Sequence, residues 1–211
     1  QPLIHGRARR SIHHRHPKTV SKPSITTRVG DKGTTFLFSG EEVFKDSPRT
    51  ETYGDVDELV SVLGVARCHA AHPDVQVALL DVQRELFTVG AELATAIDHL
   101  EGLKQRIDEK ALHAFEQRRI ALESRIAMPD GFIIPGGSGS AGSAHIDHAR
   151  TIARRLERKT VTLSRSGLIT NHALLIWLNR LSDYLWLLAR LEEGESLSLK
   201  EARRKSAGGS P

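Results

Sequence analysis

The amino-acid sequence predicts an all-α protein. Four or five long segments repeat apolar residues with the 3.6-residue period of a helix. No convincing series of segments alternates apolar and polar residues in the way that strands do. A chain of 211 residues forms one domain, or at most two small ones, and buries roughly 70% of its unfolded surface on folding.

The first two helices are expected in the first half of the chain. The first should begin at Asp55, because Asp55 and Glu58 have the spacing of a capping box, and should end near His72. The second should run from about Asp74 to Thr95. The apolar positions that support these two helices are Val56, Leu59, Val60 and Leu63, then Leu79, Val82, Leu86, Phe87 and Leu93.

The third helix, roughly Asp108 to Ile126, carries few apolar residues among many charges, which predicts an outer position. Its apolar residues are Ala111, Phe115, Leu122 and Ile126. The stretch MPDGFIIPGGSGSAG that follows cannot be a regular helix, because Pro135 and five glycines interrupt it.

The fourth helix, about Ser143 to Leu163, has charged residues at the border of its apolar face. Relative to Ile146, Arg150 and Glu157 lie only about 20 to 40 degrees from the apolar stripe. Arg154 follows Arg150 by one turn, while Arg155 and Arg158 are expected on the opposite side. The stripe itself consists of Ile146, Ala149, Ala153 and Leu156.

The fifth helix, NHALLIWLNRLSDYLWLLARL, repeats leucine at alternating spacings of four and three, which predicts a bundle seam. Its other faces are also largely apolar, so the helix should be buried. Asn179, Arg180 and Asp183 occupy neighbouring positions on it. This polar patch should therefore be satisfied inside the protein, across an interface or by a ligand.

The net charge of +4 is concentrated at the N-terminus. Residues 1–30 contain no Asp or Glu but several Arg, Lys and His, a composition typical of a mitochondrial transit peptide or of a disordered basic tail. The expected organisation is a basic leader over residues 1–22, a helical domain over 23–192 and a polar, solvated tail over 193–211. The rest of the chain is nearly neutral and only 5% aromatic, which argues against a nucleic-acid-binding protein.

Cysteine and histidine usage argues against disulfides and metal centres. The single cysteine, Cys68, has no partner for a disulfide and is expected to be a small buried residue in a reducing compartment. His145 and His148 lack the spacing of paired metal ligands, so no metal site of the protein's own is expected. No apolar run approaches the roughly 20 residues of a membrane-spanning helix.

Several short motifs could carry chemistry, although each alone is weak. GDKGTT, Gly30 to Thr35, has the composition of a phosphate-binding loop without the common spacing, and a GDKG tetrapeptide is usually a surface turn. RRLERK, Arg154 to Lys159, is most often a solvated helix face. The patch of Asn179, Arg180 and Asp183 is equally consistent with a structural polar network.

Six motifs in one order make a specific resemblance. They are TRVGDKGTT, KDSPR, YGDVDEL, FIIPGGS, ARTIARRLER and WLNRLSD, and they lie within residues 26–190. In this order the chain closely resembles the PduO-type ATP:cob(I)alamin adenosyltransferases. The resemblance implies a five-helix up-down bundle that assembles as a homotrimer, with active sites between subunits. It also implies transfer of the 5′-deoxyadenosyl group of ATP to the cobalt of cob(I)alamin, with release of triphosphate.

The resemblance assigns residues to the nucleotide. A triphosphate leaving group needs backbone N–H donors and cationic side chains, and arginine can hold two phosphate oxygens at once. Arg154 is expected to contact triphosphate, Glu157 to orient an arginine or the nucleotide, and Asn179 to bond ATP, while Mg²⁺ partly neutralises the phosphates. The whole implied set is Thr27, Arg28, Val29, Gly30, Asp31, Lys32, Thr35, Lys45, Arg154, Arg155, Glu157, Arg158, Asn179, Arg180 and Asp183.

The resemblance also assigns residues to the cobalt side of the site. Phe132 would form an apolar wall at the lower face of the corrin ring, from which water and a nitrogen ligand are excluded. Asp57 would pair with Arg150 across the subunit boundary. Val29, Val60 and Ser39 depart from the family pattern, and the loop between Pro135 and Arg150 is about two residues longer, which affects the alignment of Phe132.

The sequence leads to two hypotheses of function and two of cellular location. The first function is catalysis, with a cobalamin reductase upstream and methylmalonyl-CoA mutase downstream by analogy with the family. The alternative is a non-catalytic carrier or regulator that binds ATP or cobalamin. The leader favours the mitochondrial matrix, with the cytoplasm as the alternative.

Overall fold

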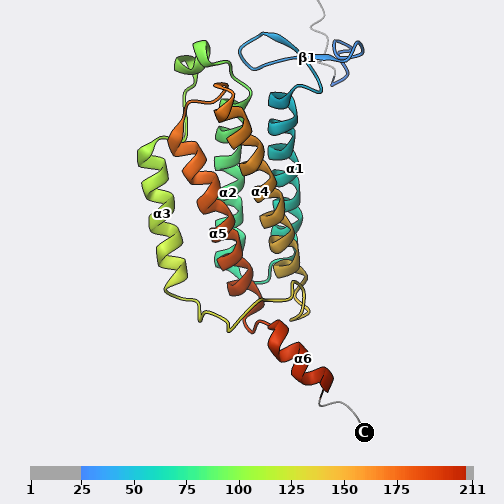
Figure 1. The fold of residues 1–211 in the computed structure, drawn as a ribbon, viewed down its shortest axis with the longest axis vertical. Coiled ribbons are helices and arrows are strands. Elements are labelled where there is room, and N and C mark those ends of the chain that lie inside the picture. Colours follow the sequence, from blue (N-terminus) through green and yellow to red (C-terminus); the bar gives the residue numbers. More distant parts are fainter. Residues whose placement is uncertain (1–24, 208–211) are drawn as a thin grey trace, which may run out of the picture.

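The computed structural model describes residues 25–207, and most of them are helical (Figure 1). Five long helices and two short ones account for this part of the chain: α1 (Pro48–His69), α2 (Pro73–Leu93), the 3₁₀ helix η1 (Ile97–Gly102), α3 (Glu109–Glu123), α4 (Ala141–Arg165), α5 (His172–Glu193) and α6 (Leu199–Ala207). The expected leader, residues 1–22, lies outside the described residues.

The long helices lie side by side (Figure 1). α4 packs between α1 and α5, α2 packs against α1, and α3 packs on α5 at the outside, which confirms the outer position expected for the third helix. α1, α3 and α5 begin at one end of the molecule, and α2 and α4 begin at the opposite end (Figure 1). Among residues 25–207, no helix is long and apolar enough to cross a membrane.

The core is apolar and continuous from α1 to α5. All four residues of the expected α4 stripe are buried, and the leucine seam of α5 is buried along its length. The Phe115 ring of α3 lies 5.0 Å from the ring of Trp177 and 5.1 Å from that of Tyr184, both on α5. Close aromatic packing of this kind attaches the outer helix to the core.

The first helix begins seven residues earlier than expected. Its N-cap is Ser47, whose hydroxyl accepts a hydrogen bond from the Thr50 N–H, and Pro48 occupies the first turn. Proline is well suited to this position because its missing N–H would have no helical partner there. Asp55 is therefore inside the helix, and its spacing from Glu58 reflects a shared face and not a helix start.

Two segments differ from the all-α expectation. Residues Thr34–Phe36 (β1) and Glu42–Phe44 (β2) form a small antiparallel hairpin in which Thr35 lies opposite Val43. The expected solvated tail contains α6, which begins at Leu199. Strands of three residues are too short to show an alternation of apolar and polar residues, so the sequence pattern does not reveal this hairpin.

Candidate functional site

The GDKGTT stretch forms the turn that leads into the hairpin. Gly33 has a φ of +82°, which favours glycine, and its carbonyl accepts a 3.0 Å hydrogen bond from the Lys45 N–H. A methyl group on Gly30 would lie 2.7 Å from the Lys45 ammonium nitrogen. The structure thus brings the Lys45 side chain against Gly30.

The remaining residues of this loop are open to solvent. Thr27, Arg28, Val29, Asp31 and Lys32 are exposed, and Thr35 is half-buried. Arg28 has a φ of +60°, an uncommon conformation for a residue with a side chain. The chain itself therefore leaves the polar groups of the loop available to a ligand.

Arg49, which the sequence interpretation did not single out, fixes the hairpin end of the molecule. Its guanidinium is buried and donates hydrogen bonds to the carbonyls of Leu93 (2.8 Å), Thr95 (3.0 Å) and Leu168 (2.8 Å). These carbonyls lie at or just after the C-terminal ends of α2 and α4. Arg49 lies in the first turn of α1, so its side chain connects the start of α1 to the ends of α2 and α4. Burial lowers the pKa of Arg49 from its usual value. The sequence signal that could have identified Arg49 is its position directly after Ser47 and Pro48 in the KDSPR motif.

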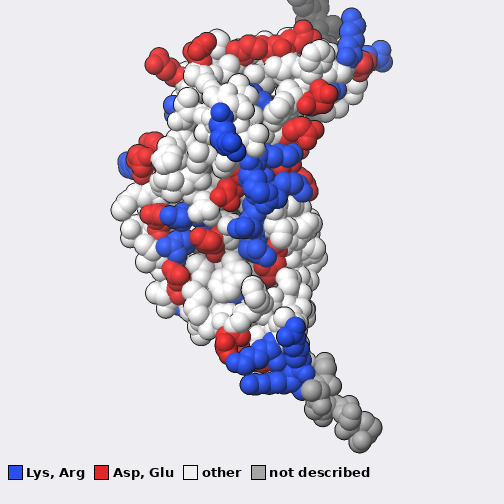
Figure 2. All heavy atoms as spheres, in the orientation of Figure 1, with Lys and Arg blue, Asp and Glu red and all other residues white. Residues whose placement is uncertain are grey.

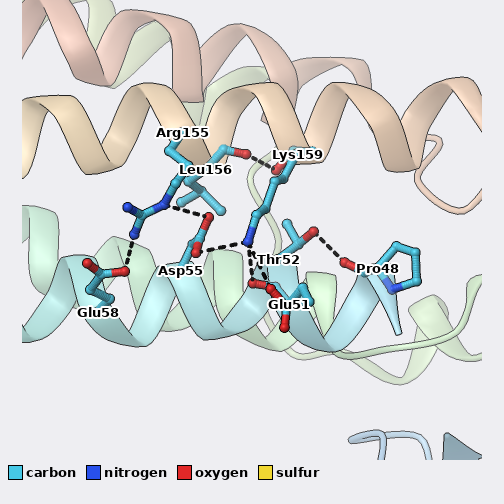
Figure 3. Close-up of polar contacts among 9 residues, drawn as sticks. Pro48, Glu51, Thr52, Asp55, Glu58, Arg155, Leu156 and Lys159 are labelled. Atoms are coloured by element: carbon cyan, nitrogen blue, oxygen red, sulfur yellow. Dashed lines mark hydrogen bonds and ion pairs between the residues drawn. The ribbon is translucent and has the colours of Figure 1, made fainter. Parts of the chain in front are cut away.

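The α4 cations divide into two groups, and the first faces α1 (Figure 3). Arg155 donates to Asp55 at 3.3 Å and pairs with Glu58. Lys159, a further residue that the sequence interpretation left out, lies 3.2 Å from Asp55 and 3.2 Å from Glu51. Arg155 therefore lies beside α1 and not opposite the apolar face of α4. It pairs there with Asp55 and Glu58, two carboxylates that lie one turn apart on α1.

Arg154 and Arg158 form the second group, and both are exposed. Neither makes an ion pair or a hydrogen bond through its side chain with any other part of residues 25–207. Figure 2 shows the Lys and Arg side chains gathered over α4 on this face. Two unpaired guanidinium groups one turn apart are suited to bind a polyanion.

The polar patch of α5 adjoins these arginines. Asn179 donates a 2.8 Å hydrogen bond to Glu157 of α4, and Arg180 donates to Asn179 at 2.7 Å and to Glu116 of α3 at 2.9 Å. Asp183 and Asn179 are exposed. The patch is therefore on the surface of a single chain and not enclosed within the bundle. Neighbouring side chains satisfy Asn179 and Arg180, whereas Asp183 has no side-chain partner among residues 25–207.

The expected pair of Asp57 and Arg150 is not formed within one chain. Arg150 bonds instead to Asp147 of its own helix, at 3.0 Å, and Asp147 also accepts a 2.6 Å hydrogen bond from buried Arg190. Asp57 is exposed beside a small hollow between α1 and α2. Its carboxylate has no partner among residues 25–207, so it remains available to a second subunit.

The loop between α3 and α4, which contains Phe132, lies at the end of the molecule opposite the hairpin (Figure 1). The Phe132 surface is 85% exposed. The hairpin precedes the start of α1, whereas the Phe132 loop precedes the start of α4. The 22 residues of α1 span about 33 Å, which sets the approximate separation of the two ends. One chain therefore places the hairpin part of the nucleotide set and the expected corrin wall at different ends.

Cys68 is exposed, contrary to the expectation of a buried residue. Within the described part of the chain, no group of three or more His, Cys, Asp and Glu side chains could hold a metal ion.

The cobalamin adenosyltransferase family model matches residues 25–192. A corrinoid adenosyltransferase of Citrobacter freundii is 41% identical over 172 residues, which cover 80% of this chain and 94% of that protein. The corrinoid adenosyltransferase PduO of the same organism is 39% identical over 173 residues, which cover 82% of this chain and 51% of that protein, so the chain spans about half of its length.

The solved structures include a variant PduO-type ATP:corrinoid adenosyltransferase from Lactobacillus reuteri, complexed with cobalamin and ATP. It is similar to this structure with a TM-score of 0.75 and 30% sequence identity, over 84% of this chain and 99% of that chain. The family match ends at residue 192, and α6 begins after it.

Proposed function

This chain belongs to the cobalamin adenosyltransferase family, and on that premise we propose that it transfers the 5′-deoxyadenosyl group of ATP to the cobalt of cob(I)alamin. The products are adenosylcobalamin and triphosphate. The observation that carries the proposal is the family match over residues 25–192, because this range contains all six motifs, from the GDKGTT loop to the polar patch of α5.

The reaction places most of its charge on the leaving group. The electron pair of the reduced cobalt attacks the 5′ carbon of ATP, the bond from that carbon to the phosphate oxygen breaks, and triphosphate departs with the bonding electrons. Cationic side chains and N–H donors aimed at the departing oxygens lower the barrier. Lys45 and the turn at Gly30 supply such groups at the hairpin, and Arg154 and Arg158 supply them on α4. Mg²⁺ bound to the phosphates would supply further neutralisation.

Neighbouring residues orient Asn179 beside these cations. Glu157 follows Arg154 on α4 and accepts the hydrogen bond from Asn179, which in turn accepts one from Arg180. This row of contacts holds Asn179 at the edge of the α4 cations, where its amide can bond the nucleotide. Arg155 fixes α4 to α1 through Asp55, so we assign it an orienting role and not a direct phosphate contact.

The corrin side requires an apolar wall. Phe132 is exposed in the single chain and has an aromatic face available to cover the lower side of the corrin ring. An apolar group there excludes water and a nitrogen ligand from the cobalt, which favours the reduced, nucleophilic state. This assignment rests on the resemblance of FIIPGGS to the corresponding family motif.

We further propose that five-helix up-down subunits assemble as a homotrimer with sites between them. Two observations support this. The GDKGTT loop and Lys45 lie at one end of α1 and the Phe132 loop lies at the other, about 33 Å away, so a site that uses both needs residues from a second copy. Asp57 is exposed and unpaired within the described chain, and Arg150 is half-buried on another helix.

The cellular setting proposed for the enzyme is the mitochondrial matrix, with the cytoplasm as the alternative. The acid-free, arginine-rich residues 1–22 support the first choice. A cobalamin reductase would supply cob(I)alamin, and methylmalonyl-CoA mutase would consume the product. Fusing residues 1–22 to a fluorescent reporter tests the location: import into mitochondria supports the leader, and diffuse cytoplasmic signal supports the alternative.

An anaerobic absorbance assay tests the function. The protein is mixed with chemically reduced cobalamin, ATP and Mg²⁺, and the adenosylcobalamin spectrum is followed together with triphosphate release. Equal amounts of the two products are expected. Binding of ATP without formation of a cobalt–carbon product would instead support a non-catalytic carrier.

A further inference from the structure

α6 is a well-anchored element beyond the part of the chain that matches the family. Ser198 and Glu201 form a capping box at its start: the Ser198 N–H donates to the Glu201 carboxylate at 2.9 Å, and the Glu201 N–H donates to the Ser198 hydroxyl at 3.2 Å. Reciprocal bonds of this kind satisfy two donors of the first helical turn. The helix therefore begins at a defined residue.

α6 is also fixed relative to Phe132. The Leu199 N–H donates to the Phe132 carbonyl at 2.8 Å, and the Ile134 N–H donates to the Leu197 carbonyl at 3.1 Å. Lys200, in the first turn of α6, pairs with Asp130 on the other side of Phe132. These contacts hold the basic helix at the base of the loop that carries the exposed aromatic ring.

A hollow of about 320 Å³ lies between α6 and this loop. Phe132 and Leu199 give it apolar walls, and Arg203 and Arg204 add two guanidinium groups. Both arginines are exposed, and neither side chain makes a hydrogen bond or an ion pair within residues 25–207. Figure 2 shows the Lys and Arg side chains clustered at this end of the molecule.

An aromatic wall beside two unpaired guanidinium groups fits an apolar ring system that carries a phosphate. Both substrates contain phosphate, but they approach the cobalt from different faces. ATP reacts at the upper face, whereas the phosphodiester of cobalamin hangs from the lower face, where Phe132 is assigned. Resting on the proposed function, we propose that Arg203 and Arg204 bind the phosphodiester of the lower nucleotide loop of the corrinoid.

Cobinamide tests the proposal because it retains the corrin ring but lacks the phosphodiester and its nucleotide. In the full-length chain, Arg203→Gln/Arg204→Gln should raise KM for cob(I)alamin roughly tenfold, since charge-assisted hydrogen bonds to phosphate are lost. KM for cob(I)inamide and KM for ATP should each change less than twofold. Added NaCl should raise KM for cob(I)alamin in the wild type more than in the double variant.

Lys205→Gln is a control for charge on α6, because it removes one positive charge at a position that does not line the hollow. The single variants Arg203→Gln and Arg204→Gln are its charge-matched counterparts. Lys205→Gln should leave all three KM values within twofold of the wild type. Equal losses with cobalamin and cobinamide would overturn the proposal and assign the arginines to the ring or to α6 stability. A rise in KM for ATP alone would assign them to ATP.

A direct binding measurement distinguishes failure of the arginine assignment from failure of the proposed function. If the wild type forms no adenosylcobalamin, the proposed function fails by itself. Binding of cob(II)alamin and cob(II)inamide, followed by absorbance, still shows whether Arg203→Gln/Arg204→Gln weakens only the phosphodiester-bearing ligand. Equal affinities of the variant and the wild type for cob(II)alamin would overturn the arginine assignment.

Discussion

At the scale of single residues, exposure distinguishes cations that can bind substrate from cations that hold the fold. Arg154 and Arg158 are exposed and unpaired within the described chain, Arg155 is paired with α1, and Arg49 is buried among carbonyls. All four are arginines in short basic or turn motifs. Their roles differ because their side chains contact different neighbours in the folded chain.

Arg154→Ala should raise KM for ATP or lower kcat. We expect a loss of about thirtyfold in kcat/KM for ATP, the ratio that corresponds to about 2 kcal/mol for a charge-assisted phosphate contact. Steady-state kinetics at saturating cob(I)alamin measure it. Arg165→Ala, an exposed arginine in the last turn of the same helix, is the control. Unchanged kcat and KM in Arg154→Ala would remove Arg154 from the site.

Arg49→Ala should destabilise the fold. It leaves two buried carbonyls, of Leu93 and Thr95, and the part-buried carbonyl of Leu168 without this donor, at a cost on the order of 3 kcal/mol. Urea unfolding followed by circular dichroism measures the loss. Arg125→Ala breaks a mostly exposed ion pair with Asp74 and should cost less than about 1 kcal/mol. Similar midpoints for both variants would contradict the role of Arg49 as a clamp.

At the scale of elements, one buried carboxylate of α1 links that helix to two cations of α4. The Asp55 side chain is 9% exposed and contacts both Arg155 and Lys159, whereas the Glu58 side chain is 46% exposed (Figure 3). A carboxylate that is shielded from water contributes more to the stability of the fold than an exposed one, because solvent screens the exposed charge. Asp55 should therefore set where the α4 cations lie along α1.

Asp55→Ala should lower the free energy of unfolding by about 2 kcal/mol, because Arg155 and Lys159 lose a shared acceptor. Glu58→Ala, one turn further along α1, is the matched control and should cost less than about 1 kcal/mol. Chemical denaturation of both variants at one ionic strength makes the comparison. A larger loss in Glu58→Ala than in Asp55→Ala would show that burial does not govern this contact.

The boundaries of elements illustrate what sequence patterns can predict. The four later long helices were predicted with ends near those observed, because their apolar periods run over many turns. The start of α1 was wrong, since Asp55 and Glu58 imitate a capping box while the actual cap is Ser47. The β1–β2 hairpin and α6 were missed because each is short, so local hydrogen bonds define them more than any repeat does.

At the scale of the whole molecule, a single chain exposes groups that a complete site would bring together. Asp57 and Arg150 do not meet within one chain, and Phe132 is about one helix length from the hairpin. The Asp57 carboxylate has no partner among residues 25–207, so it is available to pair with Arg150 of a second copy. The arrangement predicts that activity depends on assembly.

Asp57→Ala should weaken assembly or corrinoid turnover more than ATP binding. Size-exclusion chromatography with light scattering measures the oligomeric state, and KM values for both substrates measure the site. Mixing Asp57→Ala with Arg150→Ala subunits should restore part of the activity, because some interfaces then join an intact Asp57 to an intact Arg150. A trimer with normal kinetics in Asp57→Ala would refute pairing across subunits.

The sequence by itself determined the helical class, the apolar face of each long helix and the family, because periodicity and ordered motifs are local properties of the chain. Only the tertiary structure decided which cations are free. It placed Arg155 and Lys159 on Asp55, buried Arg49 among three carbonyls and set α6 beside Phe132. The physical reason is that a charge acquires its role from its distance to partners on other helices, and packing alone fixes that distance.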